Sequence, residues 1–329
     1  MMKPRYAKRV FLATALVLLA PWAAVHAQGY PSKPVQLVIP FPPGGATDIA
    51  GRLVAKKLAE RLGQPVVIDN RPGAGTVVGA AFVAKAAPDG YTLLISSGST
   101  FTVNPALMPK LPYDPIKSFE PVGMVARVPL VLLANADVPI NDLKQLVTAV
   151  RATPDKYMYG SFGNGTTGHF AGEMLWSTTG IKLQHIAYKG SAPAMNDLMA
   201  GQIPFTIDTV AAALPQLKAA KPRIKPIAVT GESRATQMPT VKTVAESGYP
   251  GFSADSWLAI AAPKGLAADA RAKLQKALAE TMKDPELREK LVANGLEYAW
   301  EPSAAVAARI ENELPRMRVI ALRSNIRID

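Results

Sequence analysis

The fold class is indicated by residues 35–62, VQLVIPFPPGGATDIAGRLVAKKLAERL. Residues 35–39 are apolar and rich in β-branched side chains, which predicts a strand. Residues 40–45 are prolines and glycines around one phenylalanine, a composition typical of a turn. Over 46–62 apolar side chains recur at helical spacing, with Ile49, Leu53, Val54 and Leu58 on one face. A strand that passes through a glycine turn into a helix is the repeating unit of α/β proteins.

The same alternation continues along the chain in two blocks. The first block adds strands at 66–69 and 91–96 around a helix that ends near Ala86, so a parallel sheet is expected. An irregular, proline-rich connection over 101–121 and extended segments up to residue 134 lead to the second block. Its strands are expected at 157–161, 183–187, 203–208 and 224–230, and its helices at 142–152 with Asn141 as N-cap, 166–178, 191–200 and up to residue 220.

The chain then returns to the first block. A strand over 256–262 is expected to rejoin the first sheet, followed by helices over 268–282, 285–294 and 302–322. The sequence therefore predicts two α/β lobes with a ligand cleft between them and closure by hinge motion. We expect the first lobe to comprise residues 28–132 and 252–329, and the second to comprise residues 133–251.

Residues 1–27 are typical of a secretory signal peptide. Four positive residues precede an apolar stretch over 10–20, and Val25-His26-Ala27 offers small residues at the −3 and −1 positions of a cleavage site. The apolar stretch is shorter than the roughly 20 residues of a membrane span, and Pro21 interrupts it. Cleavage after Ala27 would lower the net charge from +12 to +8. We expect a soluble protein exported to the bacterial periplasm.

Composition excludes several classes of chemistry. The chain has no cysteine and three histidines, of which His169 and His185 remain after cleavage, so we expect no metal site and no cofactor. Neither a GxSxG elbow nor a Walker P-loop occurs. Residues 163–168, GNGTTG, match GxGxxG formally, but no acidic residue follows about twenty positions on to hold a ribose. Lysines and arginines are scattered rather than gathered into a stripe, so nucleic acid is not an expected partner.

Two glycine turns at helix starts are the strongest candidates for a binding site. Unpaired N–H groups and the helix dipole at such a turn favour an anion such as a carboxylate or a phosphate. In the first turn Asp48 either stabilises the helix start or holds a ligand group, and both interpretations stay open. In the second, backbone amides with Ser161, Thr166 and Thr167 either grip an anion or cap a helix. Asp208 ends a predicted strand, and Lys189 either adds positive charge to the cleft or is solvated.

Short motifs along the whole mature chain make the sequence resemble the Bug family, the periplasmic solute receptors of tripartite tricarboxylate transporters. In the first lobe they are residues 30–34 (YPSKP), 38–48 (VIPFPPGGATD) with Arg52, 70–75 (NRPGAG), 88–92 (PDGYT) and 112–115 (PYDP). In the second they are 168–169 (GH), 187–190 (AYKG) and 197–201 (DLMAG). Ala187 departs from the proline usual in the family.

The resemblance implies a two-lobed periplasmic binding protein of the "Venus flytrap" type, type II-like, with no enzymatic activity. Its ligand would be a small carboxylate: a di- or tricarboxylate, an acidic amino acid or an aromatic acid. Its partners would be this ligand and the membrane permease subunits of a tripartite tricarboxylate transporter, and the receptor would be a monomer. The ligand-binding residues carried over from the family are Phe41, Pro43, Gly44, Gly45, Asp48, Ser96, Ser97, Ser161, Thr166, Thr167, Lys189 and Asp208.

Capture of a small carboxylate for a permease is thus the predicted function. A periplasmic enzyme that acts on such an acid is the alternative, but the sequence offers no evident pair of base and nucleophile. A nucleic-acid binder is a third interpretation, which would require steeply salt-dependent retention of DNA.

Overall fold

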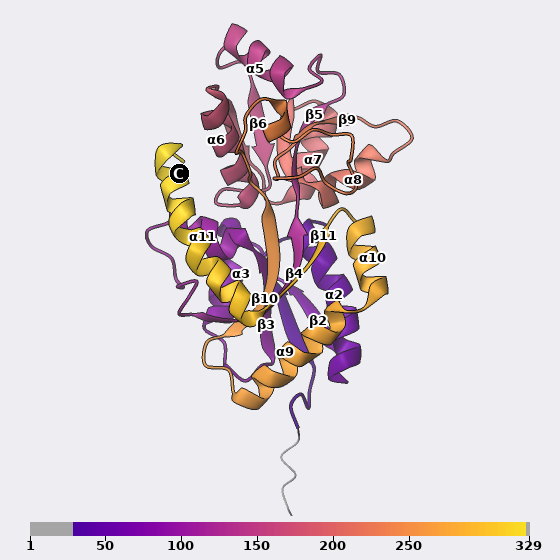
Figure 1. Ribbon diagram of the computed structural model, residues 1–329, viewed down its shortest axis with the longest axis vertical. Coiled ribbons are helices and arrows are strands. Elements are labelled where there is room, and N and C mark those ends of the chain that lie inside the picture. The colour runs from indigo at the N-terminus through magenta and orange to yellow at the C-terminus, as the bar shows by residue number, and fades with distance from the viewer. Residues whose placement is uncertain (1–28, 327–329) are drawn as a thin grey trace, which may run out of the picture.

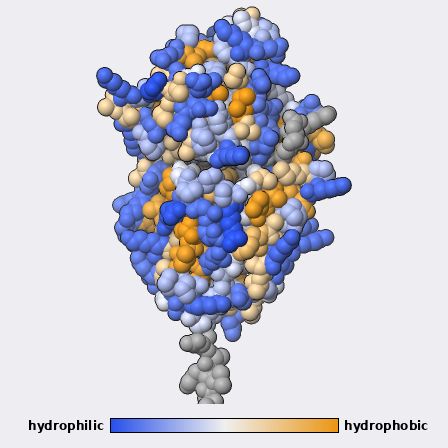
Figure 2. All heavy atoms as spheres, turned by 180° about the vertical axis from the view of Figure 1, so that it is seen from behind, coloured by the Kyte–Doolittle hydropathy of each residue, from blue (hydrophilic) through white to orange (hydrophobic). Residues whose placement is uncertain are grey.

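The computed structural model describes residues 29–326 and has two α/β lobes stacked along its long axis (Figure 1). The predicted signal peptide, residues 1–27, lies outside the described residues. Each lobe is built on one mixed β-sheet. Viewed from behind, the molecule narrows to a waist where the lobes meet, and its surface is mostly hydrophilic with scattered apolar residues on the lower lobe (Figure 2).

The first lobe contains a six-stranded sheet in the order β11-β4-β10-β3-β1-β2. Strand β1 pairs in parallel with β2 and β3, which confirms the parallel sheet predicted for the opening block. Strand β10 rejoins this sheet as predicted and runs antiparallel between β3 and β4. The strands are β1 (Val35–Ile39), β2 (Val66–Asn70), β3 (Thr92–Ser97), β4 (Phe119–Val128), β10 (Ser256–Pro263) and β11 (Glu297–Pro302).

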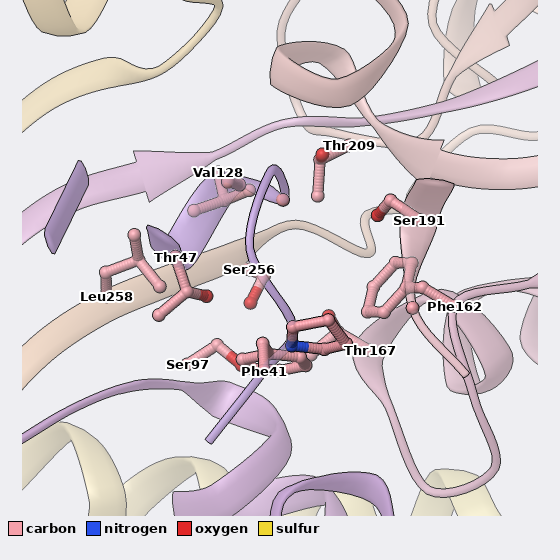
Figure 3. A pocket seen from close by; sticks show the side chains of 14 residues that line it. Phe41, Thr47, Ser97, Val128, Phe162, Thr167, Ser191, Thr209, Ser256 and Leu258 are labelled. Carbon is pink, nitrogen blue, oxygen red and sulfur yellow. The ribbon is translucent and has the colours of Figure 1, made fainter. Parts of the chain in front are cut away.

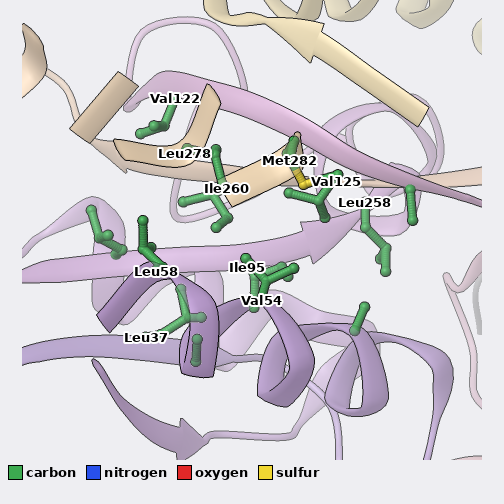
Figure 4. Packing of buried hydrophobic residues seen from close by; sticks show 14 of the residues in the cluster. Leu37, Val54, Leu58, Ile95, Val122, Val125, Leu258, Ile260, Leu278 and Met282 are labelled. Carbon is green, nitrogen blue, oxygen red and sulfur yellow. The ribbon is translucent and has the colours of Figure 1, made fainter. Parts of the chain in front are cut away.

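Helices cover both faces of the first sheet, which explains why its central strand β10 is apolar at every position after Ser256. On β10, Leu258 and Ile260 pack in a cluster with helices α2 (Ala46–Leu62), α9 (Ala268–Met282) and α10 (Pro285–Ala293) (Figure 4). The alternate residues Trp257 and Ala259 face α3 (Val77–Ala84) and α11 (Ser303–Arg323). Because successive side chains of a strand point to opposite faces, a two-sided core requires an apolar run rather than an alternating one.

The second lobe contains a five-stranded sheet in the order β7-β6-β8-β5-β9. Its strands are β5 (Leu130–Asn135), β6 (Met158–Ser161), β7 (Gln184–Ala187), β8 (Phe205–Thr209) and β9 (Ile224–Val229). The helices α5 (Leu143–Ala152) and α6 (Thr167–Thr179) cover one face, and α7 (Ser191–Ala200) and α8 (Val210–Leu217) cover the other.

The chain passes between the lobes twice. On the first passage, β4 ends at Val128 and β5 begins at Leu130, so Pro129 alone separates a strand of one sheet from a strand of the other. On the second, the segment between β9 and β10 returns to the first lobe. We propose that the chain crosses from one lobe to the other at residues 128–130 and 230–256, near the domain boundaries predicted at 132/133 and 251/252.

The structure differs from the predicted elements at a few places. The connection predicted as irregular contains a one-turn π-helix (Ser99–Val103) and α4 (Asn104–Leu107), whose polar side chains hydrogen-bond to neighbouring loops. The N-cap of α5 is Asp142 rather than Asn141, because the Asp142 carboxylate accepts from the Gln145 backbone N–H at 2.8 Å. Strand β11 was not predicted at all. Within 29–326, no helix combines the length and the hydropathy that a membrane crossing requires.

The central position of β10 predicts a large effect of truncation there. Ile260 is completely buried between α2, α9 and the sheet, so Ile260→Ala should lower the free energy of unfolding by about 2–5 kcal/mol through lost burial and a residual cavity. Urea unfolding followed by circular dichroism measures this loss. The control is Ile116→Ala, because Ile116 is 42% exposed and should change stability by no more than about 0.5 kcal/mol. Equal shifts in the two variants would contradict the placement of β10.

Candidate functional site

A small cavity lies between the lobes where the first chain crossing occurs (Figure 3). Its volume is about 30 Å³, space for about two water molecules. None of its lining residues is charged in the part of the chain that the structure describes. The lining residues are Phe41, Pro42, Gly45, Ala46, Thr47, Ser97, Val128, Phe162, Thr167, Gly190, Ser191, Thr209, Ser256 and Leu258.

The turn between β1 and α2 forms one wall of this cavity. Gly45 is the N-cap of α2 and offers no side chain to the first-turn N–H groups, so these donors and the positive end of the helix dipole lie at the cavity wall. Phe41 contributes its ring from the strand side of the turn. Pro43 and Gly44, predicted as ligand contacts, are instead exposed and lie outside the lining.

Asp48 holds this turn in place. Its carboxylate is 4% exposed and accepts from the Gly44 backbone N–H at 3.0 Å, from Arg52 Nε at 2.9 Å and from Asn70 Nδ2 at 3.0 Å. Burial raises the pKa of Asp48, but the hydrogen bonds from Arg52, Asn70 and Gly44 outweigh it and hold that pKa below its usual range. Of the two open interpretations of Asp48, the geometry favours the supporting one.

Three hydroxyl groups of the first lobe face the cavity. Thr47 lies in the first turn of α2, Ser97 at the end of β3, and Ser256 at the start of β10 (Figure 3). Ser97 Oγ accepts from the Ser99 backbone N–H at 3.2 Å, which leaves its own proton available. Ser256 is 3% exposed, and its Oγ has no hydrogen-bond partner among the described residues. These groups are able to donate to an anion.

Ser96, also predicted as a ligand contact, lies behind the wall. Its Oγ is 2.6 Å from Thr100 Oγ1, which donates to Thr76 Oγ1 at 2.7 Å, and Asn104 Nδ2 donates to Gly75 O at 2.6 Å. This network holds residues 73–76 in a left-handed backbone conformation, with φ of 91° at Thr76. Gly75 lies so close to the Asn164 carbonyl of the second lobe that a Cβ there would clash. The network therefore supports a contact between the lobes.

The second lobe contributes Ser191 and Thr209, with Asp208 directly behind them. Ser191 Oγ donates to Asp208 Oδ1 at 2.7 Å, and the Thr209 backbone N–H donates to the same oxygen at 2.7 Å. Asp208 is completely buried, and its Oδ2 has no partner in the described chain. Burial raises the pKa of Asp208 to about 6, although the hydrogen bonds from Ser191 and Thr209 oppose the rise.

The loop between β6 and α6 combines capping with contact between the lobes. Thr166 Oγ1 caps α6 and accepts from the His169 backbone N–H at 3.4 Å. The Thr167 backbone N–H donates to Ser99 Oγ of the first lobe at 3.0 Å, and Thr167 lines the cavity. Ser161 lies outside the lining, and its Oγ is 2.7 Å from His185 Nε2. The rings of His185 and His169 stack with centroids 4.2 Å apart behind this loop.

A second, larger cavity of about 710 Å³ adjoins the first. Phe41, Pro42, Phe162 and Gly190 line both cavities, so they form the partition between them. The rings of Phe41 and Phe162 meet edge to face across the lobes, with centroids 6.3 Å apart. Thr166 and the exposed Lys189 line the outer cavity only.

The structure thus divides the twelve predicted site residues into three groups. Phe41, Gly45, Ser97 and Thr167 line the inner cavity, and Thr166 and Lys189 line the outer one. The remaining six line neither: Pro43, Gly44, Asp48, Ser96, Ser161 and Asp208.

The sequence analysis missed the polar lining residues Thr47, Ser191, Thr209 and Ser256. Thr47, Ser191 and Thr209 stand at helix starts, a signal that could have found them, whereas Ser256 is the first residue of a strand and gives no such signal.

The described residues also lack the arrangement of side chains that a metal ion requires. Over residues 29–326, no group of three or more histidine or acidic side chains is arranged to hold a metal ion.

Comparison with known proteins finds a matching family and relatives that cover most of the chain. The family described as "Tripartite tricarboxylate transporter family receptor" matches residues 50–325. Protein BugT of Bordetella pertussis is 38% identical over 287 residues, which cover 87% of this chain and 86% of BugT. The predicted resemblance to the Bug family is therefore confirmed.

Solved structures extend the likeness to the whole fold. An R. palustris protein solved with adipate has a TM-score of 0.87 and 34% identity, covering 91% of this chain and 99% of its own. MatC from Rhodopseudomonas palustris, solved with bound malate, has a TM-score of 0.82 and 30% identity. The match covers 88% of this chain and 99% of MatC. The predicted two-lobed fold of periplasmic binding proteins is confirmed.

The stacked pair of His169 and His185 predicts a pH dependence of stability. Burial, and then the neighbouring His169, lower the pKa of His185 to about 3. In the unfolded chain an imidazole takes up its proton near pH 6.5. Below that pH the unfolded state binds more protons than the folded state, so stability falls as the pH decreases toward 3. When the pH is lowered from 6.5 to 4.5, the free energy of unfolding of the wild-type protein should fall by up to about 2 kcal/mol more than that of the His185→Gln variant.

Urea unfolding at several pH values measures both proteins. The raised pKa of Asp208 acts in the opposite direction, because a buried carboxylate gains stability when it is protonated, but it acts equally in both proteins and cancels in the comparison. Parallel pH profiles for wild type and variant would refute the assignment to His185.

Proposed function

Because the chain belongs to the tripartite tricarboxylate transporter receptor family, we propose that it captures a small dicarboxylate between its lobes and delivers it to a membrane permease. Members of this family are solute-binding receptors rather than enzymes. We further propose that the receptor works as a monomer in the periplasm after removal of residues 1–27.

The observation that carries the proposal is the composition of the inner cavity. Its polar wall consists of hydroxyls and a helix start, and its lining contains no cation among the described residues. Backbone N–H groups at a helix N-terminus and hydroxyl donors stabilise a carboxylate by hydrogen bonds and by the helix dipole. Such a site binds one carboxylate group without an ion pair.

The solved relatives support the choice of ligand class. Adipate and malate, present in two of these structures, are both dicarboxylates, with six and four carbon atoms. In this chain a dicarboxylate would place one carboxylate at the start of α2 and extend toward Ser191 and the Phe41–Phe162 partition.

The volume of the cavity implies movement on binding. About 30 Å³ is too little for a dicarboxylate, so entry requires the lobes to separate. The contacts that would break include the hydrogen bond from Thr167 N–H to Ser99 Oγ and the contact between the Phe41 and Phe162 rings. We propose that the lobes hinge at residues 128–130 and 230–256, where the chain crosses between them.

A thermal-shift panel tests the proposed ligand class. Malate, adipate and succinate should each be titrated against residues 28–329, with propionate, a monocarboxylate, as the control. A ligand at 100 times its dissociation constant adds about 2.7 kcal/mol of stability. This corresponds to a rise in melting temperature of about 5–10 °C at roughly 2–4 °C per kcal/mol. A flat response to all three dicarboxylates would contradict the proposed class.

Substitution at Gly45 tests the position of the site. The Cβ of an alanine at this position would lie 3.7 Å from Ser191 Oγ, an ordinary contact, so Gly45→Ala should bind within about threefold of wild type. The additional methyl groups of Gly45→Val would occupy the cavity and hold the lobes apart. We expect at least a tenfold loss of affinity for the dicarboxylate by calorimetry, with an unchanged circular dichroism spectrum. Wild-type affinity in Gly45→Val would show that the ligand binds elsewhere.

A further inference from the structure

We propose that the receptor takes up one proton when it binds a dicarboxylate, and that this proton is shared between the second carboxyl group of the ligand and the Ser191–Asp208 pair. The inference rests on the proposed function and specifies the ionisation state in which the ligand is held. It follows from the orientation of the hydrogen bonds on the second-lobe wall.

The first step is the position of Asp208. The side chain is completely buried at the end of β8, directly behind the cavity residues Ser191 and Thr209. Oδ1 accepts from Ser191 Oγ at 2.7 Å, from the Thr209 N–H at 2.7 Å and from Thr209 Oγ1 at 3.4 Å. Oδ2 is buried without a partner among the described residues.

The second step is the direction of the protons. An ionised carboxylate only accepts hydrogen bonds, so the Ser191 hydroxyl must point its proton at Asp208. Ser191 Oγ then presents lone pairs to the cavity. Thr209 behaves in the same way, because its Oγ1 accepts from the Ala212 N–H at 3.2 Å and directs its proton toward Asp208. The hydroxyl oxygens of this wall therefore accept hydrogen bonds, and the start of α7, whose N-cap Gly190 offers no side chain, adds N–H donors beside them.

The hydroxyl groups of the opposite wall have the reverse character. Thr47, Ser97 and Ser256 of the first lobe have protons available, and the start of α2 adds unpaired N–H groups. An ionised carboxylate fits the first-lobe wall, whereas the second-lobe hydroxyls fit a group that donates a hydrogen bond. The cavity thus favours a ligand that is an acceptor at one end and a donor at the other.

The third step is the absence of a neutralising charge in the described surroundings. Strands β5 and β6 and helix α8, which pack around Asp208, contain no ionisable side chain except Tyr159, whose hydroxyl donates to Glu173. On α7 the only charged residue is Asp197, which accepts from the Tyr188 hydroxyl at 2.7 Å. In the first lobe, Arg52 is paired with Asp48.

Three other cationic or titratable groups, Lys189, His185 and His169, lie near the loops of the second lobe. Lys189 is exposed and lines the outer cavity rather than the inner one. His185 and His169 stack on each other behind the β6–α6 loop, and His185 bonds to Ser161. None of these groups is hydrogen-bonded to Asp208 in the described chain.

The consequence is a coupled titration. A dicarboxylate that enters as a dianion would place its second carboxylate beside a buried, ionised Asp208. Two carboxylates that share a dry site retain one proton between them, since both ionised forms together are strongly unfavourable. The free ligand contributes no proton above pH 7, where both of its carboxyl groups are ionised. The proton therefore comes from solvent, and binding is the association of receptor, dianion and one H⁺.

Calorimetry measures this proton directly. Titration of malate and adipate at pH 7.5 in two buffers of different ionisation enthalpy should show uptake of about one proton per ligand. The dissociation constant should rise about tenfold between pH 7 and pH 8. The monoamide of adipic acid, with a carboxylate at one end and a neutral donor at the other, should bind without proton uptake and with a constant affinity over this range.

Matched variants assign the proton to Asp208. Asp208→Asn replaces the carboxylate by an amide of the same shape, so proton uptake should disappear and the affinity for adipate should become independent of pH. Asp155→Asn changes an exposed aspartate far from the cavity and should keep the uptake of wild type. If Asp208→Asn does not fold, the comparison of adipate with its monoamide on the wild-type protein still decides the question.

Each outcome has a distinct meaning. Binding of dicarboxylates without proton uptake, or uptake that persists in Asp208→Asn, overturns the inference and leaves the proposed function intact. Failure of malate, adipate and the monoamide to bind at any pH from 6 to 8 overturns the proposed function and the inference together.

Discussion

The cavity depends on one extended run of chain, residues 119–135, that serves two sheets. Up to Val128 the run pairs with β10 and β11, and from Leu130 it pairs with β8 and β9. Pro129 lacks an N–H group and ends the first ladder, while its carbonyl accepts from Val210 of the second lobe. Ser256 lies opposite Val128, and Thr209 lies opposite Leu130. The crossing therefore brings a serine of one lobe and a threonine of the other to the same cavity.

Closure of the lobes brings the hydrogen-bonding groups of both lobes to one ligand. The first lobe provides hydroxyl donors and the start of α2, and the second lobe provides hydroxyl acceptors held by Asp208 beside the start of α7. A ligand with one ionised carboxylate and one donor group contacts both walls only when the lobes close around it, with a wider gap between them than the present cavity of about 30 Å³. Because binding energy is then realised in the closed form, the ligand shifts the equilibrium toward that form by its differential affinity. The Thr167–Ser99 hydrogen bond and the Phe41–Phe162 contact add to closure without a ligand charge.

Local patterns predicted the elements well and the site only partly. The bounds of β1, α2, α7 and α9 agree with the sequence analysis, because strand composition, helical spacing and glycine ends are all local signals. Strand β11 escaped it because Trp300 and its neighbours become a strand only by pairing with β4. Among the residues predicted for the site, Gly45 and Ser97 line the inner cavity, whereas Asp48, Ser96 and Ser161 lie outside its lining and hydrogen-bond to neighbouring residues. Ser256 could not be found, since long-range pairing alone brings it to the cavity.

Asp208 places a buried negative charge directly behind a cavity that is proposed to bind an anion. The free energies of burial and of protonation explain how the receptor accommodates this charge. A buried carboxylate is destabilising, and the hydrogen bonds from Ser191 and Thr209 offset only part of the cost, as the raised pKa near 6 records. In the free receptor, the buried Asp208 carboxylate lowers the free energy of unfolding. When the second carboxylate of the ligand arrives together with one proton, this wall holds two carboxyl groups but still a single negative charge, so no further charge is buried. Asp208 therefore accommodates a ligand that supplies or shares a proton at this wall, whereas a ligand that places an unprotonated carboxylate there would add a second buried charge.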